Sequence, residues 1–176
     1  ASEIAAFFND RVIAVGTLAA DPAVVDAVNE ANRRYIGVTP ASIEAHILKM
    51  EKEWNTPAVD AYVRGMLTSR AGRLLTRWRE IDRRFLRITL TDAQGAAIAA
   101  THKTMDYFQA DEDFWQAIYA DGRGAVHMTD ILFDDVTKSY YIGLGVPVME
   151  EGTNRFIGAI DALIEVSSLF PLVHRI

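Results

Sequence analysis

The histidines and the acidic residues are the side chains best able to do chemistry in this sequence. The four histidines stand at positions 46, 102, 127 and 174, a spacing that matches no metal-ligand motif. Asp111 and Asp113 form a carboxylate pair, but they belong to an acidic loop that is expected to be solvated. Because cysteine is absent, thiol catalysis, disulfides and zinc–thiolate sites are excluded.

Sequence motifs for other common reactions are also missing. No Gly-x-Ser-x-Gly, His-Glu-x-x-His or Gly-rich phosphate-binding sequence occurs. We therefore predict that the chain is not an enzyme and that it uses no cofactor and no metal.

Length and charge narrow the class of protein further. A chain of 176 residues, 50% hydrophobic and 24% charged, predicts one globular domain with a proper core. The net charge of −6 argues against a nucleic-acid surface, which needs cations to neutralise phosphates. The sequence contains no run of about 18 apolar residues, the length that predicts a membrane-spanning helix.

The second half of the chain predicts a sheet. Five stretches rich in β-branched and aromatic residues are bounded by Gly, Asp or Asn clusters, which is typical of strands. These stretches are Phe85–Thr91, Ala96–Thr101, Gly124–Ile131, Ser139–Val148 and Arg155–Val166, with a short helix near Glu112–Tyr119. They predict an α+β fold with a five-stranded antiparallel sheet, which needs a cover on its apolar face.

The first half of the chain predicts that cover. Ile4, Phe8, Val12, Val15 and Leu18 have the spacing of one apolar face of a long N-terminal helix. Further helices follow. Asp21-Pro22 is a cap-and-proline signal, and after a break at Gly37–Pro40 either Thr39 or Ser42 is expected to cap the next helix. We predict a helical region over residues 1–84 and an αβ module over residues 85–170, which together form one domain.

Seven arginines between residues 70 and 87 form a basic cluster, interleaved with Leu74, Leu75 and Trp78. A nucleic-acid surface is one interpretation. A helix with a solvated arginine face and an apolar inner face is the favoured one. Arg87 differs from the others because it lies inside a predicted strand and shares a face with Thr89 and Thr91.

Short motifs follow one another in a recognisable order through the second half. They are Asp92-Ala93-Gln94-Gly95, Ala100-Thr101, Asp113-Phe114-Trp115, Gly124, Asp130–Asp134, Ile142–Val148 with its Pro-Val ending, and Ile157-Gly158-Ala159-Ile160. This order resembles the Cache family, also called PDC or PAS-like sensor domains, in which a long N-terminal helix precedes the αβ module. The motifs cover Ile88–Leu169, and the architecture covers the whole chain.

The resemblance implies a PAS-like sensor domain on the periplasmic or extracellular side of a bacterial inner-membrane receptor. It implies flanking membrane helices outside this chain, a homodimer through the N-terminal helix, and a small-molecule ligand. A methyl-accepting chemotaxis receptor is favoured, with a histidine kinase or a diguanylate cyclase as the alternative. A ligand-free dimerisation module and an enzyme are the remaining alternatives.

In such a module the sheet and the Lys103–Trp115 segment would enclose a small cavity. The candidate ligand-binding residues are Lys103, Tyr107, Trp115, His127, Tyr141 and Asp161. Lys103 would anchor a carboxylate, and the aromatic side chains would form walls. Asp161 stands out because it is a carboxylate in an otherwise apolar strand.

Each candidate also has a structural interpretation. Trp115 could belong to the core, Lys103 could be a solvated strand end, and His127 could be an ordinary surface histidine. Asp161 could face water on the open side of the sheet.

The ligand class follows from a comparison with the amino-acid-binding branch of the family. That branch carries a Tyr-x-x-Arg motif followed by Trp-Tyr, and an aspartate on the last strand. In this chain no arginine has that spacing from Tyr107, and Gln116 follows Trp115. The sequence therefore favours a small organic acid over an amino acid.

Overall fold

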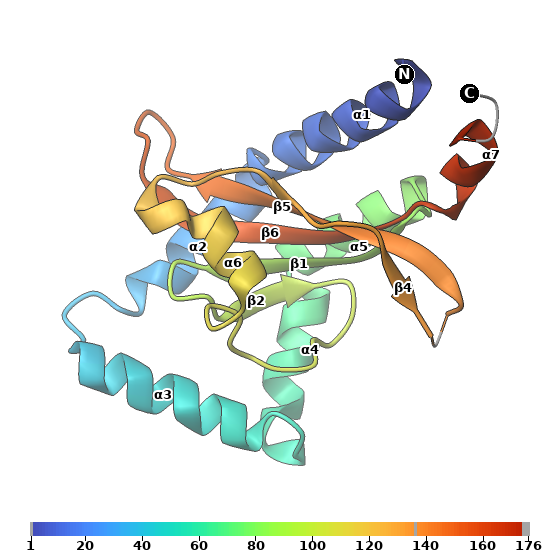
Figure 1. The fold of residues 1–176 in the computed structure, drawn as a ribbon. Helices are drawn as coiled ribbons and strands as arrows, with labels where there is room; N and C mark the ends of the chain where they lie inside the picture. Colours follow the sequence, from blue (N-terminus) through green and yellow to red (C-terminus); the bar gives the residue numbers. More distant parts are fainter. Residues whose placement is uncertain (1, 136, 174–176) are drawn as a thin grey trace.

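An antiparallel sheet organises the computed structural model, which describes residues 2–135 and 137–173. The strands are β1 (Phe85–Asp92), β2 (Ala97–Ala100), β3 (His127–Met128), β4 (Leu132–Asp134), β5 (Ser139–Met149) and β6 (Phe156–Glu165). They lie in the order β2-β1-β6-β5-β3, and β4 also pairs with β5 (Figure 1). The longest strands, β5 and β6, therefore form the centre together with β1.

The sheet has six strands in the part of the chain that the structure describes, where the sequence predicted five. The predicted strand Gly124–Ile131 is shorter than expected, because only His127 and Met128 pair regularly. β3 and β4 both pair with β5, but their registers differ by one residue. An extra residue in one strand breaks the ladder locally, which separates β4 from β3.

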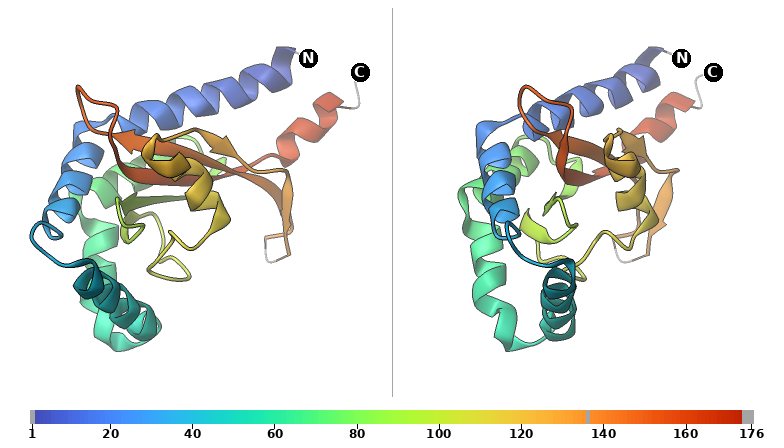
Figure 2. Two further views of the ribbon diagram at one scale, coloured as in Figure 1. Left: turned by 60° about the vertical axis from the view of Figure 1, so that its left-hand side comes forward. Right: turned by 90° about the vertical axis from the view of Figure 1, so that its left-hand side faces the viewer.

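The first half of the chain forms helices, several of which cover one face of this sheet. They are α1 (Ser2–Ala19), α2 (Pro22–Arg33), α3 (Pro40–Glu53), α4 (Asp60–Thr68) and α5 (Arg70–Ile81), with a short 3-10 turn, η1 (Pro57–Val59). Asp21 and Thr39 cap α2 and α3 as the sequence predicted, each with a proline at the start of the helix. Figure 2 shows α1, α2 and α5 on one side of the sheet and α6 (Asp113–Tyr119) on the other.

One core joins the helices to the sheet. Val15 and Leu18 of α1, Val28 of α2 and Leu75 of α5 pack in the same buried cluster as the inner residues of the strands. These inner residues include Ile88, Leu90, Ile142, Leu144, Ile160 and Ile164. The predicted α+β class, with a long N-terminal helix and further helices packed on an antiparallel sheet, is confirmed.

The chain ends with a 3-10 turn, η3 (Ser167–Leu169), and the short helix α7 (Phe170–Val173). The start of α1 and the end of α7 lie at the same corner of the molecule (Figure 1). Across residues 2–135 and 137–173, no single helix has the length and apolar content to cross a membrane; α1 and α2 would meet that criterion only as a pair bent by 55°.

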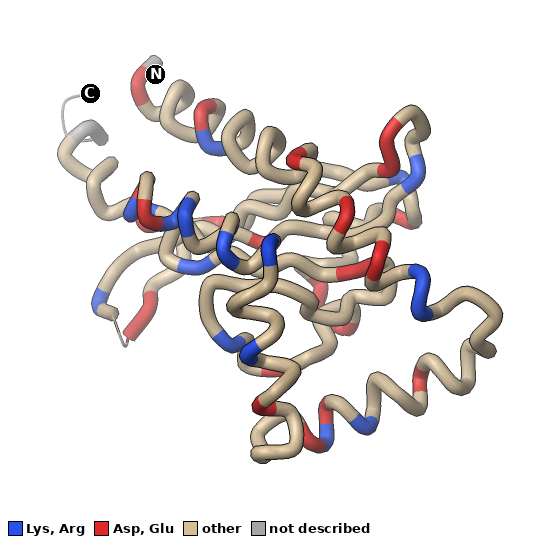
Figure 3. The backbone as a smooth tube through the Cα atoms, turned by 180° about the vertical axis from the view of Figure 1, so that it is seen from behind, with Lys and Arg blue, Asp and Glu red and all other residues tan. Residues whose placement is uncertain are grey.

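The arginine cluster follows α5 along the back of the molecule, as the blue segments of Figure 3 show. Arg70, Arg73 and Arg77 are exposed there, and Arg70 forms a surface ion pair with Asp26 at 3.6 Å. Leu75 on the same helix is fully buried. α5 therefore has a solvated arginine face and an apolar inner face. Arg87 does not belong to this helix, because it lies in β1, which follows α5 in the chain.

Candidate functional site

A cavity of about 330 Å³ lies between α6 and the face of the sheet that the first-half helices leave free. Its walls come from three central strands, from α6 and from the segments beside them. The lining residues are Arg87, Thr89, Thr91, Gln109, Glu112, Phe114, Trp115, Ile118, Thr129, Leu132, Tyr141, Gly143, Ala159, Asp161 and Leu163. The cavity thus combines aromatic and aliphatic walls with a few hydroxyl, acidic and basic groups.

Strand alternation brings the polar groups together. Successive residues of a strand point to opposite faces, so Arg87, Thr89 and Thr91 share the cavity face of β1 while Ile88 and Leu90 enter the core. Asp161 of β6 lies directly opposite Thr89 of β1. Arg87 is therefore a diagonal neighbour of Asp161 on the same face.

Two glycines of β5 give α6 its close approach. A Cβ atom on Gly145 would lie 2.2 Å from Cδ1 of Ile118, and one on Gly143 would lie 3.2 Å from the ring of Phe114. Since Gly145 also pairs with Asp161, α6 passes directly above the strand that carries the carboxylate. The missing side chains thus make room for the helix and for the cavity.

Trp115 ties α6 to the sheet. Its indole Nε1 donates a hydrogen bond to Oγ1 of Thr91 at 2.9 Å, and its ring stacks on Tyr119 at 5.3 Å between centroids. Its edge also contacts Phe156. Trp115 is therefore both a wall of the cavity and part of the buried cluster that fixes α6.

Asp161 is the most unusual group in the cavity. Its Oδ1 atom is buried and has no hydrogen-bond partner. Burial raises the pKa of the carboxyl group from 3.8 to about 6, and the nearby positive charge of Arg87 opposes that rise only in part. The structure thus holds a carboxyl group that is costly to ionise and open to a ligand.

Three of the six predicted residues line this cavity: Trp115, Tyr141 and Asp161. Lys103 lies elsewhere, because its Nζ donates to the carbonyl oxygen of Trp54 at 2.7 Å. Tyr107 is buried against Trp54 and Tyr62 beside the end of β2. His127 packs on Phe114, with 5.4 Å between ring centroids, but is not part of the lining.

Arg87 was not among the site residues that the sequence predicted. The sequence does contain a signal for its position, because Arg87, Thr89 and Thr91 alternate with apolar residues in a strand and so share one face. Thr129, Gln109 and Glu112 were also not predicted. Their place in the lining depends on how the chain between β2 and β4 folds over the sheet.

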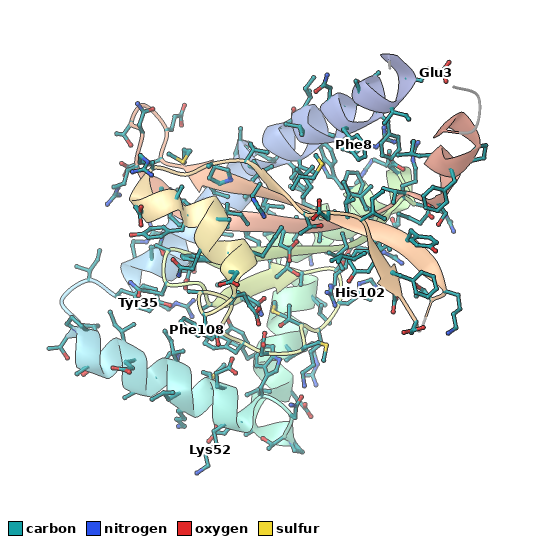
Figure 4. All side chains as sticks on the ribbon, viewed as in Figure 1. Glu3, Phe8, Tyr35, Lys52, His102 and Phe108 are labelled. Atoms are coloured by element: carbon teal, nitrogen blue, oxygen red, sulfur yellow. The ribbon has the colours of Figure 1, made fainter. Side chains whose placement is uncertain are left out.

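A second polar cluster lies at the turn between β1 and β2. The buried carboxylate of Asp92 accepts hydrogen bonds from the Tyr35 hydroxyl at 2.6 Å and from the backbone N–H groups of Gln94 and Ala96. Burial raises the pKa of Asp92, and these hydrogen bonds counteract the rise. Since the carboxylate is satisfied, the cluster holds Tyr35, after α2, against the turn (Figure 4).

Metal binding has no support among residues 2–135 and 137–173, where no group of three or more His, Asp or Glu side chains could hold an ion. The cavity lining offers carboxyl, guanidinium, hydroxyl and aromatic groups.

Comparisons with known proteins place this geometry beside sensory domains. No family model matches the sequence, and no curated protein is significantly similar to it. One similar solved structure is the ligand-binding domain of the Campylobacter jejuni chemoreceptor Tlp3 with 4-methylisoleucine, at 16% identity and a TM-score of 0.44, covering 85% of this chain and 60% of that one. A second is the sensor domain of the V. cholerae histidine kinase DctB, at 14% identity and a TM-score of 0.42, covering 81% of this chain and 57% of that one.

A third is the ligand-binding domain of the Pseudomonas aeruginosa amino-acid chemoreceptor PctC with GABA, at 14% identity and a TM-score of 0.44. It covers 93% of this chain and 64% of that one. The present chain thus spans 57% to 64% of the length of these three chains. Because the TM-scores are below 0.5, the binding residues and ligands of these proteins are not assigned to this chain.

The sequence motifs resemble those of Cache or PAS-like sensor domains, and the structure has the antiparallel sheet and the long N-terminal helix that this resemblance implied. The three solved structures described above are ligand-binding or sensor domains of two chemoreceptors and of a histidine kinase.

Proposed function

We propose that this chain is the ligand-sensing domain of a bacterial transmembrane receptor, on the periplasmic or extracellular side of the inner membrane. The observation that carries the proposal is the cavity, in which Arg87 and the unpartnered Oδ1 of Asp161 lie between aromatic walls. A buried polar atom without a partner costs free energy of folding. A small ligand that satisfies it would therefore stabilise the folded domain.

The hydrogen bonds of the cavity favour binding over catalysis. The hydroxyl groups of Thr91 and Thr129 are engaged with Trp115 and with backbone groups. Among the described residues, no lining hydroxyl is hydrogen-bonded to a carboxylate or a histidine, the arrangement that activates a nucleophile. These groups can hold and orient a ligand.

The ligand that we propose is a small organic acid. Arg87 supplies the cation for a carboxylate, the role that the sequence predicted for Lys103. A guanidinium group can bind a carboxylate through two parallel N–H donors. At about 330 Å³ the cavity suits a short molecule, because pockets for drug-sized ligands span roughly 300 to 1,000 Å³.

The receptor that we propose is a methyl-accepting chemotaxis receptor, with a histidine kinase or a diguanylate cyclase as the alternative. In this proposal membrane helices flank the chain, and α1 pairs with its copy in a homodimer. The exposed Ile13 on α1, at 67% exposure, is consistent with an apolar partner surface. Ligand binding changes the signal only as far as its affinity differs between two arrangements of α1.

The experiment is a thermal-denaturation screen of the purified domain with formate, acetate, lactate and pyruvate. A carboxylate present at about 100 times its Kd should stabilise the fold by about 2.7 kcal/mol, which is roughly 5–10 °C in a chain of this size. The Arg87→Met variant should lose this shift. Arg77→Met is the matched control, because Arg77 is exposed on α5, and it should keep the shift.

Absence of a shift with every carboxylate would contradict the proposed ligand class. A shift that survives in Arg87→Met would instead show that the carboxylate binds elsewhere.

A further inference from the structure

The Asp161 carboxyl group has few neighbours that could neutralise its charge. Thr89 of β1 and Gly145 of β5 are its cross-strand partners, and neither carries charge. Phe114, Trp115 and Ile118 of α6 contribute apolar surface to the same cavity. Such surroundings disfavour an ionised carboxylate.

The charged and titratable groups that face the cavity come from each element around Asp161. They are Arg87 on β1, Tyr141 on β5, and Glu112 just before α6. Arg87 and Asp161, both within the described chain, form no ion pair within 4.0 Å, so the guanidinium remains available to a ligand. Glu165, further along β6, accepts a hydrogen bond from the backbone N–H of Ser167 at 2.7 Å.

We propose that the cavity binds a carboxylate ligand together with a proton, which Asp161 takes up from solvent as the ligand pairs with Arg87. This inference rests on the proposed sensing function and adds the regulation of the same site. Neutral Asp161 then donates its O–H to an oxygen of the ligand. The complex contains one guanidinium and one carboxylate instead of one guanidinium and two carboxylates.

The physical reason is the cost of placing two like charges in one small, poorly solvated space. Two carboxylates that share a site cannot both stay ionised without a large penalty, and one of them binds a proton. Because the pKa of Asp161 is already about 6, protonation near neutral pH requires little additional free energy. The sensor therefore responds to acidity and to ligand concentration together.

The expected result is a binding constant that falls as pH rises. Above about pH 6, where free Asp161 is ionised, uptake of one proton predicts up to about tenfold weaker binding per pH unit. The probe is lactate or pyruvate, each ionised over this whole range. Affinity is measured by titration calorimetry between about pH 6 and about pH 8.

The variants separate Asp161 from the other carboxylate of the lining. Asp161→Asn should bind the same probe with little dependence on pH, because its amide carries no titrating proton. Glu112→Gln is the matched control, since Glu112 also lines the cavity but is exposed, and it should keep the wild-type pH profile. Calorimetry of the wild-type protein in two buffers with different ionisation heats counts the proton directly and needs no variant.

Three results would overturn the inference. Affinity that does not change with pH, a calorimetric proton count of zero, or affinity that rises with pH would each do so. The last result would show that ionised Asp161 accepts a hydrogen bond from a donor group of the ligand. In all three cases binding would still support a sensor, whereas no binding at any pH would overturn the proposed function itself.

Discussion

At the scale of single residues, Asp161 is expected to destabilise the fold without ligand and to bind the ligand in the cavity. The buried Oδ1 atom has no hydrogen-bond partner, and apolar side chains of α6 line the same cavity. A strand position that needed only stability would hold an apolar residue, as Ala159 and Leu163 do on the same face. The carboxyl group is therefore better explained by what it binds than by what it stabilises.

The cost of Asp161 should be visible in the stability of the protein without ligand. Its pKa is raised on folding from 3.8 to about 6, so the folded state holds the proton more tightly and stability falls as pH rises from about 4 to about 6. A difference of about two units corresponds to about 3 kcal/mol at most. Asp161→Asn should remove this part of the pH dependence and should be the more stable protein at neutral pH.

Urea denaturation of both proteins at several pH values measures the difference. The comparison with Asp161→Asn is needed because burial also raises the pKa of Asp92, which contributes a slope of the same sign in both proteins. Equal slopes in the two proteins would mean that Asp161 is well solvated in the folded state.

Two of the three predicted residues that lie outside the cavity, Lys103 and Tyr107, differ from those inside it in one respect; the third, His127, lies in the short strand β3. Trp115, Tyr141 and Asp161 lie in regular elements, where alternation and helix spacing fix the direction of a side chain. Lys103 and Tyr107 lie in the irregular segment after β2. Their positions depend on Trp54, which is about fifty residues away in sequence, and no local pattern reports such a contact.

At the scale of elements, a polar contact links α1 to the end of α5, just before β1 begins. Arg11 of α1 is buried, its Nη2 pairs with Oδ2 of Asp82 at 3.2 Å, and its guanidinium lies 4.0 Å from the ring centroid of Phe7. A register irregularity then separates Phe85 from Arg87 in the pairing of β1 with β6. Asp82, the C-cap of α5, thus joins α1 to the residues that lead into β1, the strand that carries Arg87 into the cavity.

The fold class could be predicted at this scale because strands and helices leave clear periodic signals. The separation of β4 from β3 could not, since it depends on the register with β5 rather than on composition. The contact between Arg11 and Asp82 also could not, because the two residues lie 71 positions apart.

The contact between α1 and the end of α5 should contribute measurably to stability. Arg11→Met keeps the aliphatic length of the side chain but leaves the partly buried Asp82 with Arg84 as its remaining cation. We expect a loss of about 2 kcal/mol, below the 3–5 kcal/mol typical of a fully buried pair. Arg84→Met is the control, since Arg84 is exposed, and it should cost about 1 kcal/mol or less.

Urea denaturation at neutral pH measures both variants. Similar losses of stability for Arg11→Met and Arg84→Met would mean that both arginines stabilise Asp82 equally. The ion pair with Arg11 would then not hold α1 in place specifically.

At the scale of the whole molecule, the helical region 1–84 and the αβ module 85–170 depend on each other. Leu18, Val28 and Leu75 from the first half are buried in the same cluster as Ile88 and Ile160 from the second. Without the helices, the apolar face of the sheet would be exposed to water, and the sheet would lose most of its hydrophobic stabilisation. The two regions are therefore expected to unfold as one cooperative unit.

The three tryptophans allow a direct test, because Trp54 and Trp78 lie in the helical region and Trp115 lies in α6. Trp115→Phe leaves fluorescence that reports only the helices, and a Trp54→Phe/Trp78→Phe double variant reports only α6. Each variant should show one urea transition, with the same midpoint and slope by fluorescence and by far-ultraviolet circular dichroism. A fluorescence midpoint that departs from the circular-dichroism midpoint of the same variant would show that one region unfolds before the other. A shift of α1 would then be coupled more weakly to the cavity, because the shared hydrophobic core is the physical connection between them.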